Sequence, residues 1–184
     1  MPKKISILAL NGSASKNSSN LTILHAIAEM GQGVFDLELF DDLSELPHFH
    51  TELTNENTPA RIIELRNRIN MADGMLICTP EYVFSIPSRL KNALEWCVST
   101  TVFSGKPLGI ITASASGEKG HEELKLIMAT VDAQFTDETT LLIQGIKGKV
   151  NASGQITDSG TKTDLEKFIQ AFSVLLHSST NGEA

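Results

Sequence analysis

The sequence lacks the features that would commit it to nucleic acid, membrane or disulfide chemistry. It holds 15 Lys and Arg against 22 Asp and Glu, a formal net charge of −7. No basic tract is longer than Lys3-Lys4, so nucleic acid and anionic membrane surfaces are not expected as partners. The longest apolar runs have strand length, so no membrane insertion is expected. The two cysteines, Cys78 and Cys97, lie in apolar runs and indicate buried thiols in a cytoplasmic protein.

The common nucleotide-binding fingerprints are also missing. Gly12 is the only glycine between Met1 and Gly31, so the sequence holds neither a P-loop nor a dinucleotide-binding turn. His48 and His50 have no further His or Cys nearby to complete a zinc site, and no metal is expected. A phosphate bound by this chain would therefore be held mainly by neutral donors.

What the chain has instead is a buried-strand pattern that runs into a polar loop. Residues 5–10 are almost entirely aliphatic, as in a strand covered on both faces of a parallel sheet. Residues 11–20 are rich in Ser and Asn, and Ile23, Ile27 and Met30 then recur at helical spacing. Such a loop gathers N–H groups, hydroxyls and the positive end of a helix dipole around one point, which suits a phosphate dianion. Helix capping alone would need only one of these residues.

The rest of the chain alternates strands with helices. Further strands are expected at residues 34–40, 75–79, 107–113 and 135–143, the first of them at a sheet edge. The later helices are marked by apolar faces of Ile62, Leu65 and Ile69; of Leu90, Leu94, Cys97 and Val98; of Leu124, Ile127, Met128 and Val131; and of Leu165, Phe168, Ile169, Phe172 and Leu175. Residues 41–59 are expected to form a surface excursion that lines a site or an interface. Residues 145–160 are expected to be exposed and polar, and residues 178–184 to fray.

This alternation predicts an α/β fold in three layers. The simplest topology with right-handed crossovers is a doubly wound, five-stranded parallel sheet of order 2-1-3-4-5. The length fits a single domain over residues 1–184, and the first strand begins so early that no room for a signal peptide is expected. Ligands of such sheets bind at the switch point. There the loops 12–20, 80–85 and 113–120 would converge.

Several motifs resemble the NADPH-dependent FMN reductase family. They are the Gly12-Ser13 turn with Ser18 and Asn20, Thr79-Pro80-Glu81-Tyr82, Ser85-Ile86-Pro87, the run from Leu90 to Trp96, Gly105-Lys106-Pro107 and Ala113-Ser114. The likeness spans roughly residues 3–145. It implies a flavodoxin-like, cytoplasmic flavoprotein, a homodimer or homotetramer, that binds FMN. Such a protein would pass two electrons from NADPH or NADH to a quinone, a flavin or another small-molecule acceptor.

The same resemblance implies the residues of the site. Ser13, Ser18 and Asn20 match positions that bind the FMN phosphate. The loop beside the isoalloxazine matches residues 80–82, and Ser114 and Gly117 match the loop at its other edge. The predicted cofactor-binding residues are Ser13, Ser15, Lys16, Ser18, Ser19, Asn20, Pro80, Glu81, Tyr82, Val83, Ser114, Ser116 and Gly117. No catalytic side chain is predicted, because the flavin carries the chemistry.

Three positions depart from the family's usual pattern. Ser15 stands where the family usually has Arg, Val83 where it has Asn, and Ser88 where it has Gly. Losing a bidentate guanidinium is expected to cost on the order of 1.5–3 kcal/mol of phosphate affinity, which Lys16 would offset in part. The alternative function is a flavodoxin-like binding or regulatory module with weakened or lost flavin binding. For Glu81, a local hydrogen-bond anchor is favoured over a general base.

Overall fold

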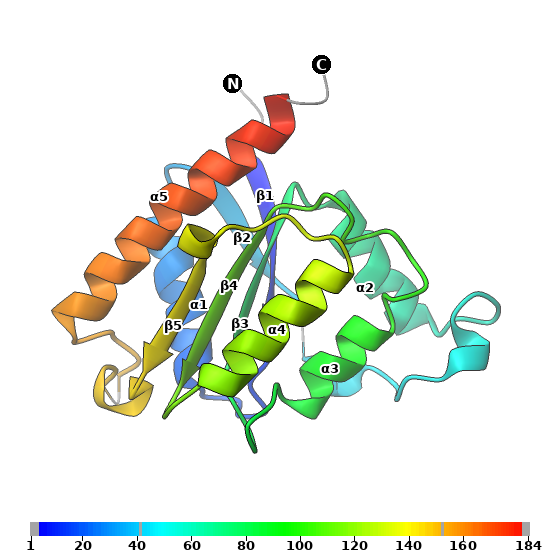
Figure 1. The fold of residues 1–184 in the computed structure, drawn as a ribbon, viewed down its shortest axis with the longest axis horizontal. Coiled ribbons are helices and arrows are strands. Elements are labelled where there is room, and N and C mark those ends of the chain that lie inside the picture. Colours follow the sequence, from blue (N-terminus) through cyan, green and yellow to red (C-terminus); the bar gives the residue numbers. More distant parts are fainter. Residues whose placement is uncertain (1–3, 41, 152, 182–184) are drawn as a thin grey trace.

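A five-stranded parallel sheet in the order β2-β1-β3-β4-β5 is the centre of the fold. The structure is a computed structural model that describes residues 4–40, 42–151 and 153–181. The strands are β1 (Ile5–Asn11), β2 (Phe35–Leu39), β3 (Gly74–Thr79), β4 (Leu108–Ser114) and β5 (Thr140–Gln144). The helices are α1 (Ser19–Met30), α2 (Ala60–Met71), α3 (Ser88–Glu95), α4 (Glu118–Thr130) and α5 (Ser159–Asn181). Helices α1 and α5 cover one face of the sheet and α2, α3 and α4 the other (Figure 1).

The architecture confirms the predicted three-layer, doubly wound fold. Strand β1 pairs in parallel with β2 on one side and β3 on the other. Successive strands are thus added first on one side of β1 and then on the other, which makes β1 and β3 the switch point of the sheet. Every residue of β3 is buried, as its continuous apolar run predicts. Strand β2 lies at the edge, and its Asp36 and Glu38 are exposed as the alternating pattern predicts. The carboxyl ends of the strands therefore share one rim.

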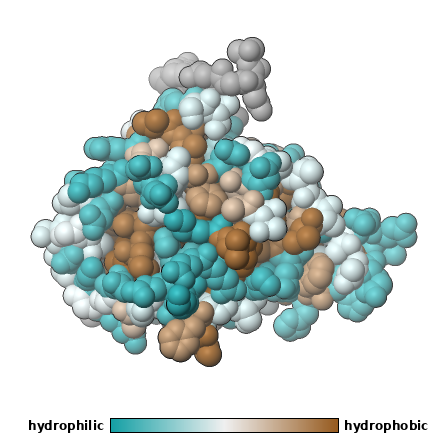
Figure 2. Space-filling model, viewed as in Figure 1, coloured by the Kyte–Doolittle hydropathy of each residue, from teal (hydrophilic) through white to brown (hydrophobic). Residues whose placement is uncertain are grey.

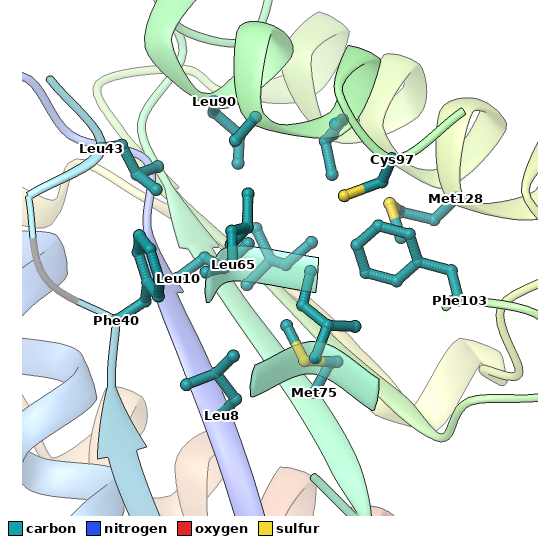
Figure 3. Close-up of a cluster of buried hydrophobic side chains, with 14 of the residues drawn as sticks. Leu8, Leu10, Phe40, Leu43, Leu65, Met75, Leu90, Cys97, Phe103 and Met128 are labelled. Carbon is teal, nitrogen blue, oxygen red and sulfur yellow. The ribbon is translucent and has the colours of Figure 1, made fainter. Parts of the chain in front are cut away.

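Alternate residues of the central strands point to opposite faces of the sheet and belong to two separate hydrophobic cores. Leu8 and Leu10 pack with α2, α3 and α4, whereas Ile7 and Ala9 pack with α1 and α5. Figure 3 shows part of the first core, where Cys97, which follows α3, lies beside Phe103 and beside Met128 of α4. Both cysteines are unpaired and buried, as predicted. Burial raises the pKa of the Cys97 thiol to about 12, so it stays protonated.

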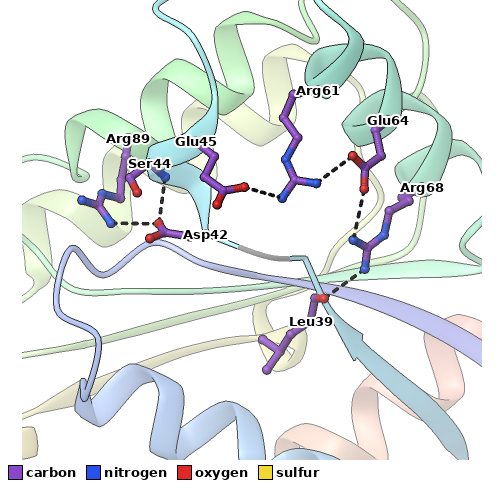
Figure 4. Close-up of polar contacts among 8 residues, drawn as sticks. All are labelled: Leu39, Asp42, Ser44, Glu45, Arg61, Glu64, Arg68 and Arg89. Carbon is purple, nitrogen blue, oxygen red and sulfur yellow. Dashed lines mark hydrogen bonds and ion pairs between the residues drawn. The ribbon is translucent and has the colours of Figure 1, made fainter.

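The connection between β2 and α2 is a surface segment, but it is fixed to the helices beneath it. The indole Nε1 of Trp96 and the Nδ2 of Asn92 both donate to the carbonyl of Pro47, at 2.8 and 3.0 Å. Phe49 packs edge-on against Trp96. A row of ion pairs follows the same segment, including Asp42 with Arg89 (Figure 4). Asp41, at the start of the predicted excursion, lies outside the described residues.

Several predicted boundaries are wrong at the ends of elements. Strand β5 begins only at Thr140, because Asp137–Thr139 forms a 3₁₀ helix closed by mutual hydrogen bonds between Thr136 and Thr139. Helix α3 ends at Glu95, and Val98 is 66 % exposed instead of facing the core. Met30, at the end of α1, is likewise exposed. Tertiary packing decided these ends, where local periodicity carries little information.

The C-terminal third also departs from expectation. The segment predicted to be exposed and polar buries Ile146 and Ile156 in the core shared by α1 and α5. In α5 the buried residue is Leu176, whereas the predicted Leu175 is only partly buried. The helix continues through Asn181, so residues 178–181 are helical, and residues 182–184 lie outside the described part of the chain. In the described part, no helix has the length and apolarity to cross a bilayer.

Candidate functional site

A cavity of about 510 Å³ opens at the carboxyl rim of the sheet. This volume lies within the range of small-molecule and cofactor sites. Its lining residues are Ser13, Ser15, Asn17, Ser18, Ser19, Asn20, Pro80, Glu81, Tyr82, Ala113, Ser114, Ala115, Gly145, Ile146 and Lys147. They come from the segments that follow β1, β3, β4 and β5, whose ends lie together at the lower edge in Figure 1. The predicted convergence of loops is therefore present, with one additional segment after β5.

The first segment is shaped for close approach to a ligand. A side chain at Gly12 would place its Cβ 2.3 Å from Thr79 Oγ1, so only glycine fits between β1 and β3. The carbonyl of the Asn11 side chain accepts from Ser13 N at 3.1 Å, and Ser13 Oγ accepts from Ser15 N at 3.2 Å. These local hydrogen bonds, each between residues two positions apart, hold the turn in a fixed conformation. The hydroxyls that face the cavity are thereby placed before any ligand binds.

The start of α1 supplies N–H groups without protein acceptors. Ser18 is the N-cap residue, and its Oγ accepts from Leu21 N at 3.1 Å. Among the described residues, no protein acceptor is found for the N–H groups of Ser19 and Asn20, the first two residues of the helix. Such N–H groups, together with the helix dipole, form an anion site.

The side chain of Asn20 is engaged inside the protein. It is 3 % exposed. Its Nδ2 donates to the carbonyl of Ala113 at 3.1 Å, and its Oδ1 accepts from Cys78 Sγ at 3.3 Å. The amide therefore ties the start of α1 to the ends of β3 and β4. The resemblance matched Asn20 to a phosphate position, but here the group directed at the cavity is its N–H and not its side chain.

Glu81 holds the loops after β3 and β4 together. Its Oε1 accepts from Gly117 N at 3.3 Å and its Oε2 from Gly120 N at 2.8 Å, while its own N–H donates to Ser114 Oγ at 3.2 Å. Gly117 precedes α4 with φ of +89° and has no side chain to cap the helix. Glu81 supplies the missing cap, which confirms the prediction of a local hydrogen-bond anchor.

The loop after β3, residues 80–85, ends in a tight turn with two central residues. Tyr82 and Ser85 exchange backbone hydrogen bonds of 2.9 and 3.1 Å. Between them, Val83 and Phe84 both have positive φ values, 53° and 57°, which a β-branched or bulky residue rarely adopts. Both side chains are exposed, Val83 to 94 %, and Figure 2 shows an apolar projection at the lower edge, where Figure 1 places this turn. Tyr82 alone of this turn reaches the cavity, with its hydroxyl 3.4 Å from Ser13 Oγ.

Most of the predicted site residues line the cavity, and the exceptions have clear structural reasons. Lys16, Val83, Ser116 and Gly117 do not belong to its lining. Val83 is at the tip of the turn, Ser116 is exposed, and the N–H of Gly117 is bound to Glu81. Lys16 lies on the other side of its loop, in a neighbouring cavity of about 340 Å³.

That neighbouring cavity holds its own compensated charges. Asp42 lines it together with Lys16 and Arg89. Hydrogen bonds from Ser44, and then the charges of Arg89 and Lys16, hold the pKa of Asp42 below its ordinary value. The positive charge of Lys16 is thus directed partly at a carboxylate of the protein, which makes it a weaker substitute for the missing arginine.

Asn17, Ala113 and Ala115 lie in the predicted loops but were not among the predicted binding residues, and the segment after β5 was not predicted to line the site at all. Gly145 N donates to the carbonyl of Ala115 at 3.1 Å, which brings residues 145–147 to the rim. One signal was available: the predicted strand order places the end of β5 beside the end of β4, and Ile146 interrupts an otherwise polar stretch.

A phosphorylated ligand with a planar head, such as FMN, fits these residues. The start of α1 offers N–H groups without protein acceptors, and hydroxyls of residues 13–19 surround them. The same lining includes Pro80, Tyr82, Ala113 and Ala115, whose flat or small side chains leave room for a planar ring.

Comparisons with known proteins point the same way. The sequence profile of the family described as NADPH-dependent FMN reductase matches residues 5–147. The chain is 28 % identical over 179 residues to a quinone reductase of Escherichia coli (strain K12), covering 94 % of this chain and 95 % of that protein. It is 31 % identical over 183 residues to an NADPH:quinone oxidoreductase of Arabidopsis thaliana, covering 94 % and 93 %. Among solved structures, the flavoenzyme FerB of Paracoccus denitrificans superposes with a TM-score of 0.82 at 24 % identity, covering 95 % of this chain and 98 % of that chain.

Proposed function

Because the chain belongs to the NADPH-dependent FMN reductase family, we propose that it transfers two electrons from NADPH or NADH, through FMN, to a small-molecule acceptor. The chain is an oxidoreductase, and its cofactors are FMN and NAD(P)H. A quinone is the favoured acceptor, since two of the similar proteins carry that activity in their names. A flavin or another small acceptor would bind in the same manner.

The observation that carries the proposal is the set of donors at the start of α1. In this proposal the N–H groups of Ser19 and Asn20 and the serine hydroxyls of residues 13–19 hold the phosphate of FMN, the hydroxyl of Ser19 included. Each is a neutral donor, and several neutral donors plus a helix dipole can replace part of a missing guanidinium.

The other residues of the cavity would place the ring. Bound FMN supplies the redox chemistry itself. Glu81 keeps the loops after β3 and β4 at a fixed separation through Gly117 and Gly120, so the space for the ring is preorganised. Ala113 and Ala115 leave room for a flat group, and Tyr82 narrows the entrance beside Ser13. These residues bind and orient; none is proposed to transfer a proton.

We further propose that residues 1–184 act as one flavodoxin-like domain that assembles as a homodimer or homotetramer in the cytoplasm. Two exposed apolar side chains, Val98 just after α3 and Leu126 in α4, support self-association. The two unpaired, buried thiols fit a reducing compartment.

The test is to isolate the protein gently without added flavin and to record its absorbance spectrum. FMN is then titrated in, with quenching of its fluorescence as the signal, and NADPH oxidation is followed with and without a quinone. We expect saturable binding at micromolar FMN, oxidation of one NADPH per quinone reduced and no rise in superoxide release when the quinone is added. A chain that binds no flavin at micromolar concentrations would be a binding module instead, and quinone-dependent superoxide release would contradict the two-electron step.

A further inference from the structure

The cavity is lined by one lysine to which the proposed function gives no role. Its lining includes two charged residues, Glu81 and Lys147. The carboxylate of Glu81 is occupied by the N–H groups of Gly117 and Gly120. Lys147 is exposed, and within the described residues it has neither an ion pair nor a hydrogen bond. The carboxylate of Glu81 thus has hydrogen-bond partners within the protein, whereas the ammonium group of Lys147 has none among the described residues.

The segment that carries Lys147 is fixed next to the phosphate-binding end. Gly145 N is bound to the carbonyl of Ala115, and Ile146 is buried in the core that α1 and α5 share. Further along the same excursion, a Cβ on Gly154 would lie 3.8 Å from Thr22 Oγ1 on α1. Residues on both sides of Lys147 are thus tied to the rim or to α1. Lys147 is therefore held in a segment that lines the same cavity as the first residues of α1.

A phosphate dianion at this place would be stabilised further by such a charge. The protein as a whole has a net charge of −7, and the donors after β1 are neutral. Ser15 brings no charge, and Lys16 lies in the neighbouring cavity with Asp42. A Lys ammonium can pair with phosphate as a point charge from any direction that its flexible stem reaches.

We propose that Lys147 is the cation that pairs with the FMN phosphate, in place of an arginine in the loop after β1. This inference rests on the proposed function, because it takes FMN as the ligand. It assigns a binding role to the segment after β5, which lines the cavity together with the start of α1.

The test compares Lys147→Gln with Lys149→Gln, a matched control in the same segment that does not line the cavity. Dissociation constants for FMN and for riboflavin are measured by fluorescence quenching at low and high salt. We expect Lys147→Gln to weaken FMN binding about ten-fold, as for a lost charge-assisted bond, and to leave riboflavin within about two-fold. The salt dependence of FMN binding should also fall, and Lys147→Arg should restore both properties.

Lys149→Gln is expected to behave as the wild type in all of these titrations. Equal FMN affinity in the wild type and Lys147→Gln would overturn the role of Lys147. The proposed function would still stand in that case, because the wild type would still bind FMN and oxidise NADPH. An equal loss of FMN and riboflavin would also overturn it, since that pattern marks a general disturbance of the cavity. A change confined to the KM for NADPH would assign the charge to the electron donor instead. If the wild type binds neither flavin, both proposals fail.

Discussion

The two sides of the cavity use their polar groups in opposite ways. On the anchored side, residues 80–85 and 113–117, the carboxylate of Glu81 and the hydroxyl of Ser114 are hydrogen-bonded to protein groups. On the open side, residues 13–20 and 145–147, Lys147 and two N–H groups of α1 have no protein partner in the described structure. The difference separates groups that shape the site from groups that are free to bind a ligand. The open side also holds anchoring groups: the side chain of Asn20 is bound to Ala113, and the hydroxyls of Ser13 and Ser18 accept backbone N–H groups.

The largest effect is expected at Asn20, the buried anchoring side chain on the open side of the cavity. Asn20→Ala leaves the Ala113 carbonyl and the Cys78 thiol without their buried partner, and we expect a loss of about 3 kcal/mol in the free energy of unfolding. FMN and riboflavin should weaken to the same extent, because the whole rim loosens. Thermal unfolding and flavin titration measure both.

Asn17→Ala is the matched control for that experiment, since Asn17 is exposed and lines the same cavity. Its melting temperature should equal that of the wild type. Selective loss of FMN in Asn20→Ala, with riboflavin unchanged, would show that the amide contacts the phosphate after all.

The next effect concerns Glu81, the main contact of the anchored side. Glu81→Gln puts an amide donor against the N–H of Gly117 or Gly120, and we expect about 2 kcal/mol of destabilisation. For a chain of this size the melting temperature should fall by about 4–8 °C. Both flavins should bind more weakly. Glu122→Gln, which removes an exposed ion pair on α4, should change stability by less than about 0.5 kcal/mol; a similar loss in both variants would argue against an anchor.

Ser18 and Ser19 are neighbours on the open side, but only the hydroxyl of Ser18 is bound to a protein group. Ser18→Ala removes the cap of α1 and should cost about 1 kcal/mol of stability. Ser19→Ala removes a hydroxyl that makes no hydrogen bond to described protein groups, so stability should not change. FMN affinity should still fall several-fold, by about 1 kcal/mol, while riboflavin affinity holds. Calorimetry measures the stability of both variants, and titration measures their flavin affinity. A stability loss in Ser19→Ala would show that its hydroxyl anchors the protein and is not free to bind a ligand.

The smallest effect is expected at the turn of the anchored side. The positive φ values of Val83 and Phe84 store strain that the surrounding bonds must offset. The double change Val83→Asn with Phe84→Gly suits a type I′ turn and should stabilise the fold by about 1 kcal/mol. Val98→Asn, another exposed valine but with φ in the ordinary negative range, should give no gain in melting temperature. A gain there too would attribute the effect to lost surface hydrophobicity.

Much of the site could be placed from the sequence because its position follows from strand order. The apolar runs 5–10, 75–79 and 107–113 had to be central, and parallel strands bring their carboxyl ends to one rim. The polar loop of residues 11–20 then lay at that rim without any knowledge of contacts. The sequence could not predict that Lys16 turns away from the cavity and that Lys147 enters it, since neighbouring side chains leave a loop in different directions.

Taken alone, the sequence determined the sheet, its order and the rim at which a phosphate-bearing cofactor would bind, because periodicity and apolar run length are local properties. Only the tertiary structure decided the partners of each polar group. Hydrogen bonds such as those from Gly120 to Glu81 and from Asn20 to Ala113 join residues 39 and 93 positions apart. No local pattern records such pairs, because they form only when the loops of different strands meet in space.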